Sequence, residues 1–183
     1  MPHLCKLVDE DGNEISATNP LDVQLSGSKT GKQATATITL AHDVAAHHAG
    51  DVVSTAAGAI LEFANLGAAG DLIDIIGVRT KYAATGIPTA HTGWKLRLFN
   101  AAPTVIADNA AFNVIAADVG KYIRVIPLSV LEDVGDNCFS QDDAVNMTAK
   151  LVTTSLYGVL TCNAAETPAI DTVITIIIDT VAL

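Results

Sequence analysis

The sequence predicts an all-β protein: a two-sheet β-sandwich of the jelly-roll type with an extended N-terminal arm. Three observations predict this fold class. Segments that alternate apolar and polar residues recur at short intervals, Gly, Pro and Asn turn signals separate them, and no segment has the apolar spacing of a three-turn amphipathic helix. About eight or nine such strands fit a jelly roll or another two-sheet sandwich. A chain of 183 residues is long enough for one domain with a substantial core.

The first 33 residues form the predicted arm and linker. Leu4–Val8 has the composition of a short strand, Asp11-Gly12 is a turn pair, and a polar, extended run leads to Pro20. Residues 26–33 have the composition of a flexible linker. This arm has too few apolar residues to fold alone, so we expect it to order against a neighbouring molecule; a disordered tail is the alternative. The sandwich domain then spans residues 34–183.

Four strands are predicted before the middle of the chain, at residues 35–40, 52–55, 59–64 and 72–82. The fourth has apolar residues on both faces in its first half, with Ile73 and Ile75 opposite Leu72 and Ile76. This pattern predicts a strand that lies deep in its sheet at the start and is more exposed after Gly77. The Ala-rich piece 41–49 is compatible with one helical turn, and residues 83–93 form a predicted loop.

The segment 94–127 contains two predicted strands and a long crossover between them. Trp94, Leu96 and Leu98 share one face of the first strand. The chain leaves the sheet at residue 100 and re-enters a strand over 121–126, and Pro127 ends that strand's pairing. Three apolar side chains of the crossover are expected to cover an open end of the sandwich: Phe112, Val114 and Ile115. The last three predicted strands span residues 145–152, 156–162 and 172–179.

Composition restricts the class of partner. The formal net charge is −10 and the pI is near 4.6, which argues against nucleic acid, because phosphate backbones are bound by Lys and Arg. No apolar run approaches the roughly 18 to 20 residues of a membrane helix, and the amino end lacks the pattern of a secretory signal. Only 16% of residues are charged and the mean hydropathy is +0.39. These values favour a homo-oligomer whose surface is partly covered by copies of itself or by a lattice, with a monomer of large core as the alternative.

No metal or cofactor site is predicted, although several clusters invite one. His42, His47 and His48 lie close together, with Asp43 and Asp51 as possible further ligands, but nothing in the sequence determines a ligand geometry. The acidic run from Glu132 to Asp143, with a turn at Gly135 and Asn137, lacks the spacing of a calcium loop. Cys5, Cys138 and Cys162 form no C-x-x-C pair, so we expect free, mostly buried thiols in a reducing cytoplasm.

No catalytic residue is predicted either. Residues 27–33 have glycines and lysines but not the spacing of a phosphate-binding loop, and no nucleophile-elbow pattern exists. Asp71 and Asp74 are a carboxylate pair of the type that glycosidases use. With aromatic residues at 4% and a single Trp, the chain lacks the stacking surfaces of a sugar-binding cleft. An enzyme is therefore not expected.

One resemblance points to a function. The run L-R-L-F-N-A-A-P-T-V-I-A-D-N-A-A-F at residues 96–112, followed by A-D-V-G-K-Y-I at 117–123 and S-L-Y-G-V-L at 155–160, resembles a family of small tailed-bacteriophage virion proteins. The likeness covers roughly residues 50 to 180, and Arg124 stands where that family more often has Gly. In addition, D-G-N-E-I-S-A-T-N-P-L-D-V at residues 11–23 is similar to the N-terminal arms of phage structural proteins.

The resemblance implies a capsid decoration (cement) protein with a jelly-roll fold. On this interpretation the protein is made in the host cytoplasm and lies on the outer surface of the capsid. It binds across neighbouring major capsid protein subunits as a homotrimer, through the arm and its Ala- and Thr-rich faces. The alternatives are a tail or fibre component that binds a host surface, and a sugar-binding or enzymatic sandwich domain that uses Asp71 or Asp74.

Overall fold

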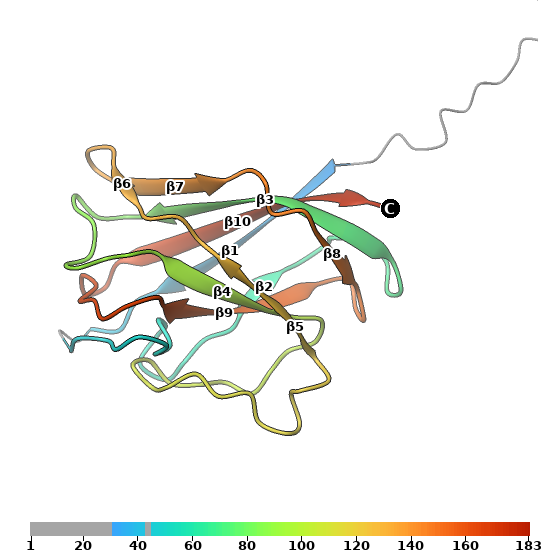
Figure 1. Cartoon of the computed structure of the whole chain (residues 1–183), viewed down its shortest axis with the longest axis horizontal. Coiled ribbons are helices and arrows are strands. Elements are labelled where there is room, and N and C mark those ends of the chain that lie inside the picture. Colours follow the sequence, from blue (N-terminus) through green and yellow to red (C-terminus); the bar gives the residue numbers. More distant parts are fainter. Residues whose placement is uncertain (1–30, 43–44) are drawn as a thin grey trace, which may run out of the picture.

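The protein is an all-β sandwich of two antiparallel sheets packed against each other (Figure 1), which confirms the predicted fold class. The computed structural model describes residues 31–42 and 45–183. The predicted strand at Leu4–Val8, most of the arm, Cys5 and Asp43 lie outside these residues. Within the described ranges there are ten strands, and no helix there is long and apolar enough to cross a membrane.

Six strands form the larger sheet and four form the smaller one. The larger sheet has the order β1-β10-β3-β7-β6, with β8 also paired to β3, and the smaller sheet has the order β2-β9-β4-β5. The larger sheet contains β1 (Gly31–Thr39), β3 (Leu72–Tyr82), β6 (Glu132–Asp133), β7 (Cys138–Asp142), β8 (Met147–Lys150) and β10 (Val173–Ala182). The smaller sheet contains β2 (Leu61–Phe63), β4 (Trp94–Phe99), β5 (Tyr122–Pro127) and β9 (Leu156–Cys162).

One hydrophobic core fills the space between the sheets. As predicted, Trp94, Leu96 and Leu98 of β4 all face this core and are at most 1% exposed. Ala34, Ala36 and Ile38 alternate with exposed threonines along β1 in the same way. The period of two in the sequence therefore determines which face of each sheet is buried.

Three predictions about elements need correction. The linker was predicted to continue through Gln33, but Gly31–Gln33 already pair with β10, so β1 begins at Gly31. Residues 52–55 form no strand; Asp51 and Val52 make only isolated bridges, to Ala111 and Thr161. Where residues 41–49 are described they form no helical turn, because the backbone of His47 pairs with Glu166.

The prediction for the face pattern of β3 was also wrong. Ile73 and Ile75 are buried in its first half, as are Val78, Thr80 and Tyr82 in its second half, so exposure does not increase after Gly77. The pairing with β10 skips Ile76, which is a β-bulge. The bulge inserts one residue and shifts the alternation, and both halves therefore point their buried residues to the same side.

The crossover between β4 and β5 covers the outer face of the smaller sheet, and not an open end of the sandwich as predicted. Leu98 faces the main core, whereas its neighbour Phe99 faces outward into a second apolar cluster with Val52 and Val159. Phe112 and Val114 pack on that cluster, while Ile115 is 41% exposed. The apolar outer face is what the crossover protects from water.

Candidate functional site

A buried polar cluster centres on Glu166, in the loop after β9. Its carboxylate accepts hydrogen bonds from the indole N–H of Trp94 and the thiol of Cys162 (3.3 Å), and pairs with Nδ1 of His91 (2.7 Å). The side chains of His91 and Glu166 are 0% and 1% exposed. Because these contacts join the loop to Trp94 of β4 and Cys162 of β9, and the side chains are almost fully buried, the cluster fastens the loop to both strands.

The two described cysteines are free and buried, as predicted. Burial raises the pKa of the Cys162 thiol, and the nearby Glu166 carboxylate raises it further. Burial likewise raises the pKa of the Cys138 thiol. Because the thiolate is the reactive form of cysteine, these raised pKa values disfavour the reactive form at both positions.

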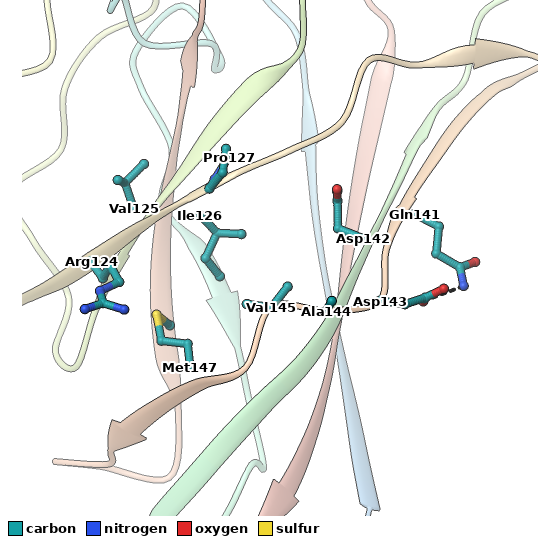
Figure 2. A pocket seen from close by; sticks show the side chains of 10 residues that line it. All are labelled: Arg124, Val125, Ile126, Pro127, Gln141, Asp142, Asp143, Ala144, Val145 and Met147. Carbon is teal, nitrogen blue, oxygen red and sulfur yellow. Dashed lines mark hydrogen bonds between the residues drawn. The ribbon is translucent and has the colours of Figure 1, made fainter.

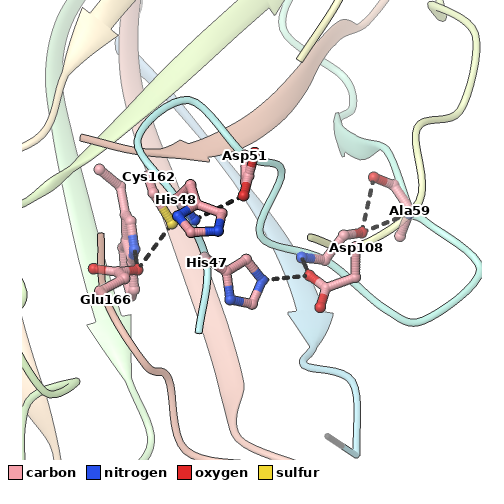
Figure 3. Close-up of polar contacts among 9 residues, drawn as sticks. His47, His48, Asp51, Ala59, Asp108, Cys162 and Glu166 are labelled. Atoms are coloured by element: carbon pink, nitrogen blue, oxygen red, sulfur yellow. Dashed lines mark hydrogen bonds and ion pairs between the residues drawn. The ribbon is translucent and has the colours of Figure 1, made fainter. Parts of the chain in front are cut away.

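The histidines of the predicted cluster are directed to different partners. His42 pairs with Asp171 (2.5 Å) at the surface, and His47 pairs with the buried Asp108 (3.1 Å), which also accepts the backbone N–H of Ser54 (2.6 Å). Figure 3 shows His47 turned toward Asp108, while Asp51 accepts the backbone N–H of His48. Across residues 31–42 and 45–183, no three His, Cys, Asp or Glu side chains are grouped so as to hold a metal ion.

The acidic residues singled out in the sequence take part in local structure. Asp133 accepts the backbone N–H of Gly135 in the turn between β6 and β7, at the predicted turn position. Asp71 accepts the N–H of Ala68 (2.7 Å), and Asp74 accepts the hydroxyl of Thr148 (2.6 Å). Asp71 and Asp74 are thus engaged separately, by a turn and by a neighbouring strand.

A groove of about 520 Å³ opens between β5 and the connection from β7 to β8 (Figure 2). Its floor is apolar, with buried Ile126 and Met147 and half-buried Val145. Arg124 stands on the β5 wall, and Asp142 and Asp143 stand on the other. The volume lies within the ~300–1,000 Å³ typical of binding pockets, so the arrangement is suited to holding a partially apolar ligand.

The outer face of the larger sheet is the other candidate surface, and it is rich in threonine. Thr35 and Thr37 of β1 are exposed, and Thr37 is in register with Thr175 of β10. Asp179 is neutralised there by Arg79 (3.1 Å) and accepts the amide of Gln33 (2.8 Å). The alanines of β1, Ala34 and Ala36, point into the core.

Sequence inspection missed Glu166, Asp108 and the groove. The one available signal was the single Trp, since a buried indole N–H needs an acceptor. Its acceptor lies 72 positions away along the chain, and no local pattern marks such a pair. No family model and no curated protein matches this sequence.

Proposed function

We propose that this chain is a non-enzymatic virion protein that decorates and stabilises a bacteriophage capsid. It would bind across neighbouring major capsid protein subunits as a homotrimer on the outer surface of the shell, after synthesis in the host cytoplasm. By burying surface on two subunits at once, it opposes the outward pressure of packaged DNA. The observation that carries the proposal is the threonine-rich outer face of the larger sheet, where charges of both signs occur and Arg79 pairs with Asp179, so that the face is suited to lie on a protein surface.

The resemblance to phage virion proteins supports the proposal through residues with defined structural tasks. In the D-N-A-A-F run, Asp108 holds Ser54 and His47, and Phe112 packs near Phe99 and beneath Arg97, whose guanidinium lies 4.5 Å from the ring centre. These residues fasten the crossover to the smaller sheet. They therefore account for a shared fold better than for a shared catalytic site.

We further infer that the sandwich is a jelly roll. The support is its strand order: β1-β10-β3-β7 faces β2-β9-β4-β5, and the chain changes sheet at nearly every connection in its first half. This order places the first and last strands side by side and nests two Greek keys, as jelly rolls do. β6 and β8 are then additions to the larger sheet.

The hydrogen bonds and the burial of the candidate carboxylates support a non-enzymatic role. Asp71 and Asp74 accept hydrogen bonds from local structure, and Glu166 is sealed from solvent. A carboxylate acting as acid or base must instead reach a substrate.

The test is electron microscopy of particles of the phage that encodes the chain, with a gold-labelled antibody raised against residues 34–183. Label over the head is expected. Label confined to the tail would reject the capsid role in favour of host binding, and unlabelled particles would reject the virion assignment itself.

A second test addresses the outer face of the larger sheet. Purified protein is added to expanded shells that lack it, and binding is measured by co-sedimentation. Thr37→Arg, on the exposed face of β1, is expected to abolish binding, whereas Thr154→Arg, in the exposed loop after β8, is expected to leave it unchanged. Equal binding by the two variants would show that the outer face of the larger sheet is not the surface that binds the shell.

A further inference from the structure

We propose that the groove beside β5 binds residues 21–25, Leu-Asp-Val-Gln-Leu, of a second copy of this chain. This inference concerns the isolated protein. It therefore holds or fails independently of the capsid role.

The backbone of β5 is open on the side of the groove. β5 pairs with β4 alone within the described part of the chain. The N–H of Leu128 donates to the carbonyl of Trp94. Because backbone groups alternate in direction along a strand, Leu128, Ile126 and Arg124 direct their N–H and C=O groups toward β4. Val125 and Pro127 consequently turn theirs to the open side, where a proline is tolerated because no ladder bond is lost. The N–H and C=O of Val125 and the C=O of Pro127 are available to a short added strand.

The apolar floor of the groove fits the pattern of residues 21–25. Leu21, Val23 and Leu25 alternate with Asp22 and Gln24, which is the period of a strand with one apolar face. A strand added beside β5 would direct its apolar side chains inward. There they would meet the floor formed by Ile126, Val145 and Met147, which Figure 2 shows gathered between the two walls.

Charge also favours the N-terminal segment as the occupant. Arg124 is the basic residue of the groove lining, and it has no ion-pair partner among the described residues. Before residue 26 the chain carries one basic residue, Lys6, against these acidic ones: Asp9, Glu10, Asp11, Glu14 and Asp22. The carboxylates on the opposite wall already accept hydrogen bonds, Asp142 from Ser129 (2.5 Å) and Asp143 from Gln141 (2.6 Å).

The length of chain between residues 21–25 and the start of β1 favours a segment that comes from a second copy. Lys32 pairs with Thr180 of β10, Thr180 pairs with Ile75 of β3, and Ile75 pairs with Met147 of β8. Three strand spacings, or ~14 Å across the sheet, therefore separate Lys32 from Met147. A chain on the outer face must then also cross the edge of the sheet at β8 to enter the groove. The six Cα–Cα steps from Gly31 to Leu25 span at most ~20–22 Å when fully extended. Entry into the groove of the same molecule therefore requires a fully extended linker, whereas a second copy imposes no such constraint.

Such an exchange is a head-to-tail contact, in which the segment of one copy occupies the groove of the next. Contacts of this kind form closed rings when the rotation between copies closes. The proposal therefore gives the predicted homo-oligomer a specific interface.

Disulfide trapping between two full-length variants tests the proposal. Both carry Cys5→Ser; one adds Val23→Cys with a size tag, and the other adds Val145→Cys in the groove. After mixing and mild oxidation, non-reducing electrophoresis is expected to show the mixed dimer in several-fold excess over a control that pairs Val23→Cys with Thr35→Cys. Thr35 is exposed on β1. Cross-linking at Thr35→Cys therefore measures random encounters between the two cysteines. Ala144→Cys, exposed on the same wall, serves as a second groove position.

Two further variants test the contacts. Arg124→Glu is expected to lower the yield of mixed dimer several-fold, while Lys81→Glu, exposed on β3, is expected to leave the yield unchanged. The proposal is overturned if the groove and Thr35 positions cross-link equally, if only intramolecular products form when Val23→Cys and Val145→Cys are combined in one chain, or if the folded protein stays monomeric at all concentrations.

Discussion

The carboxylate of Glu166 holds together residues that lie far apart in the chain. It accepts the indole N–H of Trp94 and pairs with Nδ1 of His91 inside the core. In Glu166→Ala both partners lose their acceptor, and breaking a buried pair of this kind costs about 3–5 kcal/mol. We expect the free energy of unfolding, measured by urea denaturation, to fall by about that amount.

A matched control separates this effect from the general cost of removing a glutamate. Glu132 on β6 is exposed, and Glu132→Ala is expected to change the free energy of unfolding by less than about 0.5 kcal/mol. Similar values for the two variants would show that the Glu166 contacts contribute little to stability.

Asp118 closes the crossover by joining its beginning to its end. It accepts the ammonium of Lys121 (2.8 Å) and the backbone N–H of Thr104 (2.8 Å), and these contacts, the Lys121 bond first, lower the pKa of its carboxyl group from 3.8 to about 2. Because the pKa is lower in the folded state, the carboxylate stabilises the fold above pH ~4 and loses this effect as the pH falls through the folded value.

The pH dependence of stability tests this account of Asp118. The melting temperature of the native protein should exceed that of Asp118→Asn above pH ~4, and the difference should decline between pH 3.8 and about 2. A difference that stays constant down to pH 2 would contradict the assigned role of the ionised carboxylate.

Among the elements, β3 shows how far the sequence determines a strand. Its bounds at Leu72 and Tyr82 match the predicted segment, because β-branched residues and alternation mark it clearly. The bulge at Ile76 was not predicted, because a bulge is defined by pairing with another strand and leaves no local signature. For the same reason, β1 began earlier than predicted: the polar, Gly-containing Gly31–Gln33 are strand residues only because β10 supplies their partners.

The start of β4 depends on Gly93. Its φ is +95°, and a Cβ at this position would lie 2.5 Å from the carbonyl oxygen of Leu128. A side chain in the left-handed region costs roughly 1–2 kcal/mol, and the contact with backbone adds to this cost. We expect Gly93→Ala to lower the free energy of unfolding by at least about 2 kcal/mol in denaturant titration.

Gly86, in the same loop, is the control for Gly93. A Cβ at Gly86 meets no atom within 4 Å, so Gly86→Ala should be close to neutral. If the two substitutions have the same effect, the close approach to Leu128 does not constrain the loop.

At the scale of the whole molecule, the sequence was sufficient for the two-sheet sandwich but not for its sites. Patterns of period two identify buried faces, and therefore two layers, without knowledge of which strands pair. The groove and the contact between His47 and Asp108, 61 positions apart, arise from strand order, which a single sequence does not encode locally. The same limit explains why the crossover was assigned to an open end although it covers the smaller sheet.

The boundary of the domain gives the last prediction. β1 supplies Ala34, Ala36 and Ile38 to the core and covers the edge of β10. A truncated chain of residues 31–183 should therefore melt within a few degrees of the full chain. A chain of residues 41–183 should fail to fold or should aggregate, because it loses core volume and exposes the apolar edge of β10. Circular dichroism melts with size-exclusion chromatography measure both outcomes. A large loss of stability on removing residues 1–30 alone would instead show that the arm belongs to the folded domain.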